Sequence, residues 1–256
     1  MTGSLKYDGA QTDRHNPRTA ALRALAGFAE GDVVFLAGST QEPEEQFAID
    51  VYRRLSAVHP RLRLVIVPRH PERFDAVAEL LESSGLIWQR RSRLGGAERD
   101  KPSPNPSLTG RGTKTSREPT GRRPILLVDT VGELGAWWGT ATIAFVGGSF
   151  GSRGGQNMIE PAAYGAAVSF GPNTRNFRDV VTALLAANAA VVVQDANELE
   201  AFVRRCLEEP AYAAALGARA QALVRSQLGA TERTIALVEA LPLTPSALRS
   251  AERSAA

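Results

Sequence analysis

Several residue types that mark particular protein classes are scarce in this chain. Its 256 residues include one cysteine, Cys206, which excludes an internal disulfide and a cysteine-rich zinc site. Apolar runs such as residues 33–37 and 125–128 are far shorter than the roughly 20 residues that cross a bilayer. No apolar segment typical of a secretory signal follows Met1. We therefore expect a cytoplasmic protein with no membrane span.

Histidine is also rare, and its spacing bears on metal chemistry. The three histidines, His15, His59 and His70, do not share the spacing of a metal site, so we expect no metal cofactor. Cys206 lies in a helical pattern without a paired histidine, and we interpret it as a small buried apolar side chain.

The charge is unevenly placed along the chain. The net charge is +3, but residues 95–123 hold seven basic and three acidic residues, so that the remainder sums to −1. Basic residues concentrated in one stretch, without interleaved aromatics, argue against a nucleic-acid partner. The same stretch is rich in proline, glycine, serine and threonine, with almost no large apolar side chain. It is therefore predicted to be a disordered insertion.

Outside that insertion, apolar strand patterns alternate with helical ones. The predicted strands are residues 33–37, 62–67, 86–92, 125–128, 142–146, 167–170 and 190–193. The predicted helices are residues 47–58, with a first turn at residues 43–45, then residues 74–81, 133–138, 159–164 and a helical region at 197–241 that breaks near Pro210 and Gly229. Short connections between alternating strands and helices predict an α/β fold with a single Rossmann-like, doubly wound parallel sheet.

This pattern divides the chain into three parts. Residues 1–32 are expected to be a lead-in arm from an inter-domain linker, residues 33–244 the sheet domain, and residues 245–256 a flexible tail. In a doubly wound sheet, ligands bind beyond the carboxyl ends of the strands. The candidate site residues are therefore those that follow the predicted strands.

The loop after the strand at 142–146 is rich in glycine. Residues 147–155 hold five glycines and lead into a helix, an arrangement that suits an anion or phosphate cradle and includes Gly148 and Ser149. The loop contains neither a Walker nor a dinucleotide-binding pattern. The alternative is a tight strand-to-helix turn whose glycines need a positive φ.

Asn157 and Glu160 lie three residues apart, on one face of a helical turn. A carboxylate there can accept both hydroxyls of a ribose, and an amide can bind a base or a hydroxyl. The alternative for Glu160 is an ordinary helix N-terminal carboxylate stabilised by the macrodipole.

Other strand ends also carry chemically useful side chains. Arg69 offers a planar fork for phosphate or carboxylate, whereas His70 is either a phosphate donor or a packed histidine. Asp129 and Glu133 suggest a paired-carboxylate catalyst only if they face each other, and Asp129 can equally cap the following turn. The adjacent tryptophans at 137–138 are expected to pack in the core rather than to stack on a ligand.

Taken together, the strand-end motifs resemble one family, the bacterial Kdo transferases, which attach 3-deoxy-D-manno-octulosonic acid (Kdo) to lipid A precursors. The resemblance covers nearly the whole chain except the insertion and the tail. It runs through residues 2–8, 37–40, 67–74, 90–92, 129–134, 145–149, 157–161 and 171–173. It implies the C-terminal, donor-binding half of a GT-B glycosyltransferase.

The resemblance also implies CMP-Kdo as the donor substrate. It assigns Arg69 to the donor phosphate, Glu160 to the ribose and Asn157 to a polar edge of the nucleotide or sugar. The glycine-rich loop would meet the charged sugar and phosphate. The nucleotide- and substrate-binding residues that we expect are Pro68, Arg69, His70, Val131, Gly132, Glu133, Gly148, Ser149, Asn157, Met158, Ile159 and Glu160.

Three features depart from the family pattern. Gln156 stands where relatives have histidine, which keeps hydrogen bonding but removes a protonatable group. The insertion replaces a short connection. The family's N-terminal half, with its membrane anchor, acceptor surface and catalytic glutamate base, has no counterpart here. Met1 stands where relatives read valine, so we expect an in-frame upstream region that encodes that half.

The expected function is therefore a donor domain for Kdo transfer, with no catalytic residue of its own. The lipid A precursor would bind through the N-terminal half, and a full-length relative would work at the cytoplasmic face of the inner membrane. Two alternatives stay open: a GT-B transferase or epimerase that uses a uracil nucleotide sugar, and a non-catalytic nucleotide-binding module. Base preference distinguishes the first. CMP binding without transfer, even when an N-terminal half is supplied, distinguishes the second.

Overall fold

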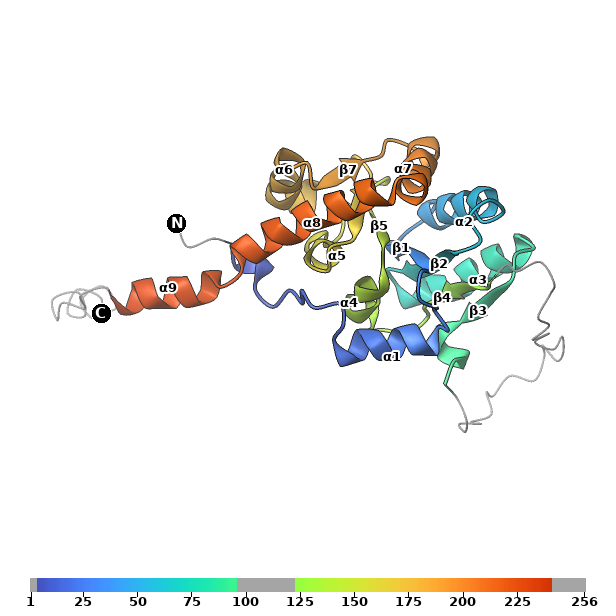
Figure 1. Cartoon of the computed structure of the whole chain (residues 1–256), viewed down its shortest axis with the longest axis horizontal. Helices are drawn as coiled ribbons and strands as arrows, with labels where there is room; N and C mark the ends of the chain where they lie inside the picture. Colours follow the sequence, from blue (N-terminus) through green and yellow to red (C-terminus); the bar gives the residue numbers. More distant parts are fainter. Residues whose placement is uncertain (1–3, 96–122, 241–256) are drawn as a thin grey trace, which may run out of the picture.

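A computed structural model describes residues 4–95 and 123–240 of the chain. Within these residues, seven parallel strands form one sheet in the order β3-β4-β2-β1-β5-β6-β7 (Figure 1). The strands are β1 (Val33–Thr40), β2 (Leu62–Pro68), β3 (Trp88–Arg90), β4 (Ile125–Leu127), β5 (Ile143–Val146), β6 (Ala167–Phe170) and β7 (Ala190–Val192). The prediction of an α/β fold with a doubly wound parallel sheet is confirmed. Apart from its first and last residues, the predicted insertion lies outside the described residues, as does the predicted tail.

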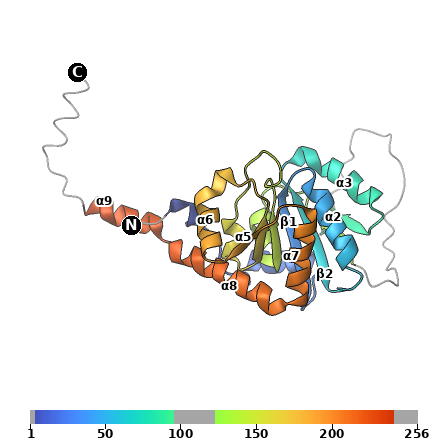
Figure 2. The same ribbon diagram turned by 90° about the horizontal axis from the view of Figure 1, so that it is seen from above.

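Helices cover both faces of the sheet (Figure 2). They are α1 (Pro17–Leu25), α2 (Glu44–Leu55), α3 (Phe74–Ser83), α4 (Leu134–Trp137), α5 (Ile159–Ala163), α6 (Arg178–Ala186), α7 (Ala196–Glu208), α8 (Pro210–Gln227) and α9 (Ala230–Glu239). Short 3-10 turns lie between them: η1 (Leu5–Tyr7), η2 (Pro71–Arg73), η3 (Arg91–Arg93), η4 (Trp138–Thr140) and η5 (Arg175–Phe177).

Alternate residues of the central strands pack on opposite faces, which explains their continuous apolar runs. In β1, Val34 and Leu36 join a core cluster formed with α1, α4, α5 and α6, whereas Phe35 and Ala37 join a second cluster with α2, α3 and α7. All four side chains are fully buried. Helix α8 contributes to both clusters, so it links the two layers.

The predicted elements agree with the structure except in a few places. Helices α1 and α6 were not expected, and α1 lies in the predicted lead-in arm. In α1 only Thr19 and Leu22 are buried, so its apolar pattern is weak; the helix is fixed at its start by Asn16, whose side chain accepts a 3.0 Å hydrogen bond from the Thr19 N–H. Helix α2 begins at Glu44, within its predicted first turn, and β3 is shorter than predicted.

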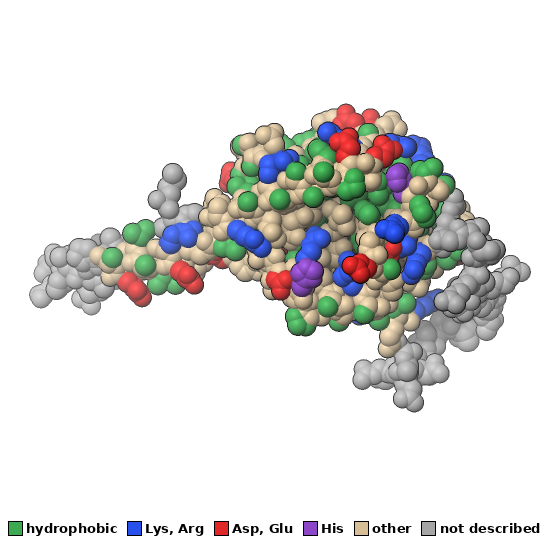
Figure 3. Space-filling model, viewed as in Figure 1, with side chains coloured by type: hydrophobic (Ala, Val, Ile, Leu, Met, Phe, Trp, Pro, Cys, Tyr) green, Lys and Arg blue, Asp and Glu red, His purple; other side chains and the backbone are tan. Residues whose placement is uncertain are grey.

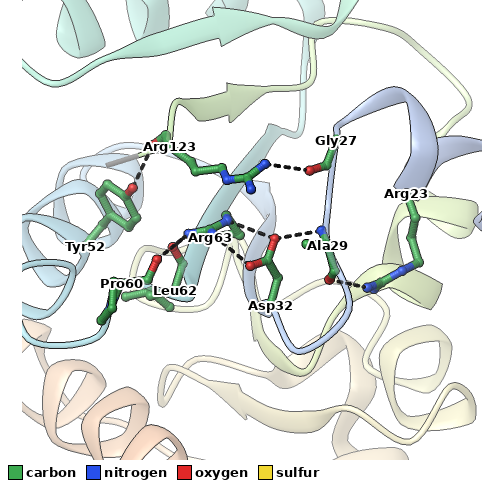
Figure 4. Close-up of polar contacts among 9 residues, drawn as sticks. All are labelled: Arg23, Gly27, Ala29, Asp32, Tyr52, Pro60, Leu62, Arg63 and Arg123. Atoms are coloured by element: carbon green, nitrogen blue, oxygen red, sulfur yellow. Dashed lines mark hydrogen bonds and ion pairs between the residues drawn. The ribbon is translucent and has the colours of Figure 1, made fainter. Parts of the chain in front are cut away.

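At the amino ends of the strands, a buried ion pair ties the segment before β1 to β2 (Figure 4). Arg63 donates to both carboxylate oxygens of Asp32, at 3.0 and 2.7 Å, and to the carbonyls of Pro60 and Leu62. Their side chains are 7% and 4% exposed, so this pair is largely removed from water. Arg123 joins the same region by donating to the Gly27 carbonyl.

The amino edge also carries a groove of about 770 Å³ between α8 and residues 12–15. Figure 3 shows the side of the molecule on which α8 lies in front, where basic, acidic and hydrophobic side chains are interspersed. In Figure 2, α8 runs along the lower side and the loop between β5 and α5 lies at the top, so this groove is on the side of the sheet opposite to the carboxyl ends.

None of the described helices is long and apolar enough to cross a membrane.

Candidate functional site

The candidate site lies at the carboxyl edge of the sheet, around its central strand. From β1 the sheet grows to one side through β2 and β4 and to the other side through β5, β6 and β7. This reversal is a topological switch point, where parallel α/β sheets bind ligands. The loops that meet here include residues 69–73, 128–133 and 147–158, which carry most of the predicted site residues.

Glu160 is the central charged group of the site. The side-chain amide of Asn157 donates a 3.0 Å hydrogen bond to one of its carboxylate oxygens. The side-chain oxygen of Asn157 in turn accepts from the Ile159 N–H. The carboxylate is half-buried, and burial raises its pKa, while the Asn157 amide, the charge of Arg69 and the Trp138 indole act in the opposite direction. The structure thus brings Arg69, from the loop after β2, within electrostatic reach of the predicted pair of Asn157 and Glu160.

Glu133, by contrast, has its carboxylate filled by partners of this chain. Arg91 binds both of its oxygens, at 2.9 and 2.7 Å, and Thr130 and Trp137 also donate to it. Burial alone would raise the pKa of Glu133, but hydrogen bonds from Thr130, Arg91 and Trp137 outweigh it and hold the pKa below its usual value. Glu133 therefore stabilises the loop between β4 and α4.

Asp129 and Glu133 do not form a catalytic pair, because each is bound to a different arginine. Asp129 accepts from the backbone and hydroxyl of Ser92, at 2.8 and 2.7 Å, and pairs with Arg90 at 3.3 Å. These contacts join the loop after β4 to η3 rather than creating an acid–base site. The expectation that Asp129 caps the following turn is likewise not what its contacts show.

The backbone amides of the glycine-rich loop between β5 and α5 already bind the side-chain carboxyl group of Glu44. The backbone N–H groups of Gly148, Ser149 and Phe150 donate to the Glu44 carboxylate at 2.8, 2.9 and 3.1 Å. Gly148 has a φ of +66°, and Gly154 and Gly155 also have positive φ. The glycine-dependent turn, given above as the alternative, is therefore present, and the amides that were predicted to bind a ligand anion are occupied by Glu44 of the same chain.

Hydrogen bonds tie most neighbouring loops of this edge to one another. Arg73 pairs with Glu45 of α2 at 3.1 Å, and Ser149 accepts from the Gly171 N–H at 2.8 Å. Among the described residues, no hydrogen bond or ion pair joins the loop after β2 to the loop after β4. Arg69 is exposed in the first of these loops and acts electrostatically on Glu160.

The other predicted site residues differ in whether their side chains are exposed or buried. Pro68 is buried at the end of β2, His70 is half-buried, and Val131 is 78% exposed beside Gly132, whose φ is +84°. The side chains of Met158 and Ile159 belong to the hydrophobic core, so only their backbone can meet a ligand.

Sequence reasoning missed three residues of the site: Glu44, Arg91 and Trp138. Both tryptophans of the pair at 137–138 are buried, as expected, but their indoles also stabilise Glu133 and Glu160. A signal for this role was their position directly after the loop of β4. In the described part of the chain, no group of three His, Cys, Asp or Glu side chains is arranged to hold a metal ion.

Comparison with curated proteins identifies similar chains of about twice the length. A 3-deoxy-D-manno-octulosonic acid transferase of Bordetella pertussis is 36% identical over 245 residues, which cover 93% of this chain and 51% of that protein. The enzyme of the same name from Haemophilus influenzae is 30% identical over 240 residues, with the same two coverages. The chain thus spans about half the length of the curated relatives it matches. No family model matches it.

Solved structures give the same relationship at the level of the fold. The C-terminal CMP-Kdo binding domain of WaaA from Acinetobacter baumannii superposes with a TM-score of 0.66 at 29% identity, covering 81% of this chain and 96% of that domain. WaaG, a glycosyltransferase involved in lipopolysaccharide biosynthesis, superposes with a TM-score of 0.54 at 14% identity over 86% of this chain and 51% of WaaG, which shows a shared fold alone. The GT-B domain fold implied by the motifs is therefore confirmed.

Proposed function

Since this chain is a homologue of the Kdo transferases, we propose that it is the glycosyltransferase domain that binds the donor CMP-Kdo. The whole enzyme would then transfer Kdo to a lipid A precursor in lipopolysaccharide synthesis. The observation that carries the proposal is the Arg69, Asn157 and Glu160 constellation at the switch point of the sheet. These three side chains are the ones that the family resemblance assigns to the nucleotide.

Each group has a defined task in this proposal. The ionised Glu160 accepts hydrogen bonds from the ribose hydroxyls, and Asn157, which already donates to Glu160, orients that carboxylate. Arg69 is exposed, and its guanidinium binds the phosphate through two N–H groups. The backbone of residues 131–133 lines the other side, since Arg91 and its partners already fill the Glu133 carboxylate.

The transfer itself exchanges one bond at the anomeric carbon of Kdo. The acceptor hydroxyl oxygen bonds to that carbon with inversion, the bond to the CMP phosphate oxygen breaks, and CMP leaves with the electron pair. Arg69 stabilises the negative charge that develops on the leaving phosphate. The hydroxyl proton passes to a base that we assign to the half of the relatives that this chain does not match, together with the acceptor surface.

The division of the chain follows the same proposal. Residues 33–244 would form the donor domain, and residues 1–32, including α1, would lead into it from an inter-domain linker. No metal takes part in the proposed chemistry. In the whole protein, the domain would act at the cytoplasmic face of the inner membrane, where the lipid acceptor is presented.

Nucleotide titrations by calorimetry test the proposal. CMP is expected to bind more tightly than UMP, and Arg69→Ala is expected to weaken CMP binding at least roughly tenfold, because a charge-assisted hydrogen bond contributes about 1.5–3 kcal/mol. Cytidine, which lacks the phosphate, should lose little in this variant. Arg73→Ala is the matched control, since Arg73 pairs with Glu45. Preference for UMP would favour a uracil nucleotide sugar, and indifference to the base or to Arg69 would overturn the proposal.

A further inference from the structure

Glu44 is a buried carboxylate at the start of α2 whose partners are all backbone N–H groups. Its side chain accepts from Gly148 and Gln41 through one oxygen, at 2.8 and 2.9 Å, and from Ser149 and Phe150 through the other, at 2.9 and 3.1 Å. The residue is 1% exposed, and among the described residues no cation forms an ion pair with it.

Such an arrangement is demanding in its geometry. A buried carboxylate is tolerated only when its lone pairs are satisfied, and consecutive N–H groups that converge on one point form an anion-binding nest. The close approach also requires glycine: a Cβ on Gly147 would lie 2.6 Å from a Glu44 carboxylate oxygen and 2.7 Å from the Ser39 carbonyl oxygen. Gly147 is thus required by the close approach of Glu44 and of the β1 backbone, and Gly148 by its φ of +66°.

The loop held by Glu44 leads directly to the residues of the nucleotide site. The Gly155 N–H donates to the Gly148 carbonyl at 2.8 Å, which closes the loop two residues before Asn157. Phe150 packs against Phe145 and Phe47, with ring centroids 5.6 and 5.4 Å away. Glu44 therefore fixes the start of the loop, and the hydrogen bond between Gly155 and Gly148 fixes its end, from which the site residues follow.

We propose that Glu44 is a positioning residue of the donor site: it fills the amides of the β5–α5 loop, so that Asn157 and Glu160 are held ready for the ribose and the donor phosphate is left to Arg69. This inference rests on the proposed function. It replaces the expectation that the glycine-rich loop itself binds the phosphate. The two arrangements differ in what happens to affinity when the Glu44 charge is removed. If Glu44 positions the ribose contacts, CMP and cytidine affinities should change together. If the loop amides bind the phosphate, the affinity for CMP should change relative to that for cytidine.

The experiment compares two neighbouring glutamates of equal burial. Glu44→Gln removes the anion that the loop amides bind, and Glu45→Gln is the matched control, since Glu45 is also 1% exposed but pairs with Arg73. Glu44→Gln is expected to weaken CMP and cytidine binding together, each roughly tenfold, because the ribose contacts are lost in both. Glu45→Gln is expected to leave both affinities within about threefold of the unmodified chain.

Other results would overturn the inference. If Glu44→Gln tightens CMP relative to cytidine, the loop amides compete for the phosphate and Glu44 opposes binding. If Glu44→Gln and Glu45→Gln behave alike in folded protein, Glu44 has only a structural role. In either case the unmodified chain still binds CMP, whereas absence of CMP binding in the unmodified chain refutes the proposed function instead.

A measurement on the unmodified chain decides the matter should Glu44→Gln not fold. In ¹⁵N–¹H spectra, the amides of Gly148, Ser149 and Phe150 should shift less on CMP addition than those of residues 131–133, because Glu44 keeps its hydrogen bonds in the complex. Largest shifts at residues 148–150 would show the phosphate taking the place of Glu44 and would contradict the inference.

Discussion

Replacing Glu160 by glutamine should weaken nucleotide binding while leaving the free domain no less stable. The Glu160 carboxylate is half-buried, its strongest contact is the neutral amide of Asn157, and burial raises its pKa. Burial therefore makes the ionised form less favourable than in the unfolded chain, and hydrogen bonds donated by a ligand would make it more favourable. Glutamine has the same shape without the charge, so Glu160→Gln removes the desolvation cost together with the ligand contact.

The size of the binding effect follows from the type of hydrogen bond lost. A hydrogen bond to a charged acceptor contributes about 1.5–3 kcal/mol, so CMP affinity should fall roughly 10- to 150-fold. Calorimetry with CMP measures this loss, and urea unfolding of the free domain measures stability. The free energy of unfolding should stay equal or rise, as expected where a functional group is kept at the expense of stability.

The stability of the domain and its affinity for CMP should both depend on pH through Glu160. Because the pKa of Glu160 is raised in the folded protein, its ionised form costs stability above that pKa, and this cost disappears as the pH falls through it. CMP binding requires the ionised form, so affinity should decrease over the same acidic range. Glu160→Gln should remove both dependences, leaving weak binding that changes little with pH.

Glu133→Gln is the control variant, because the ionised Glu133 stabilises the folded domain whereas the ionised Glu160 destabilises it. The hydrogen bonds of Glu133 hold its pKa below the usual value, so its contribution to stability is present above the unfolded pKa and is lost as the pH falls through the folded pKa. Losing the two contacts with Arg91 at this partly exposed pair should cost about 1–2 kcal/mol. If Glu160→Gln were as destabilising as Glu133→Gln while CMP affinity stayed unchanged, the distinction drawn between the two carboxylates would be wrong.

Three further predictions concern stability. Asp32→Ala should lower the free energy of unfolding by about 3–5 kcal/mol, because it leaves the 7%-exposed Arg63 side chain unpaired; urea unfolding checks this, and the double variant with Arg63→Met should recover most of the loss. Gly217→Ala should cost about 1–3 kcal/mol, since its Cβ would lie 2.1 Å from the Gly165 carbonyl oxygen; an unchanged melting temperature would contradict it. Asp8→Ala should speed hydrogen exchange in α9, because Asp8 accepts from three consecutive N–H groups at the start of that helix; and since hydrogen bonds from residue 231 lower the pKa of Asp8, unmodified α9 should loosen as the pH falls through that pKa.

The sheet and its functional edge were predictable because their signals are local. Continuous apolar runs fixed the central strands, since parallel strands covered on both faces have no polar alternation. The carboxyl ends of those strands then bring residues such as Arg69 and Glu160 to one edge by topology alone. Helix α1 was missed because it buries only two side chains and so lacks a clear periodic pattern.

The partners of the charged groups were not predictable, because they come from distant parts of the chain. Glu44 contacts a loop 104 residues further along, and Glu133 contacts an arginine 42 residues before it. Acidic residues at a helix start ordinarily suggest a macrodipole effect at the surface. Nothing in the local sequence shows that Glu44 is buried under a glycine-rich loop.

The three glutamates of the site can be told apart only by which of their oxygens are already filled. Glu44 is satisfied by four N–H groups and Glu133 by three side chains, whereas Glu160 keeps acceptor capacity beyond Asn157 and Trp138. The adjacent indoles of residues 137 and 138 donate to Glu133 and Glu160 respectively, so the consecutive elements α4 and η4 stabilise both carboxylates. We expect a displacement of α4 and η4 to move the backbone of the β4–α4 loop and the Glu160 carboxylate together, which would couple the two sides of the proposed nucleotide site.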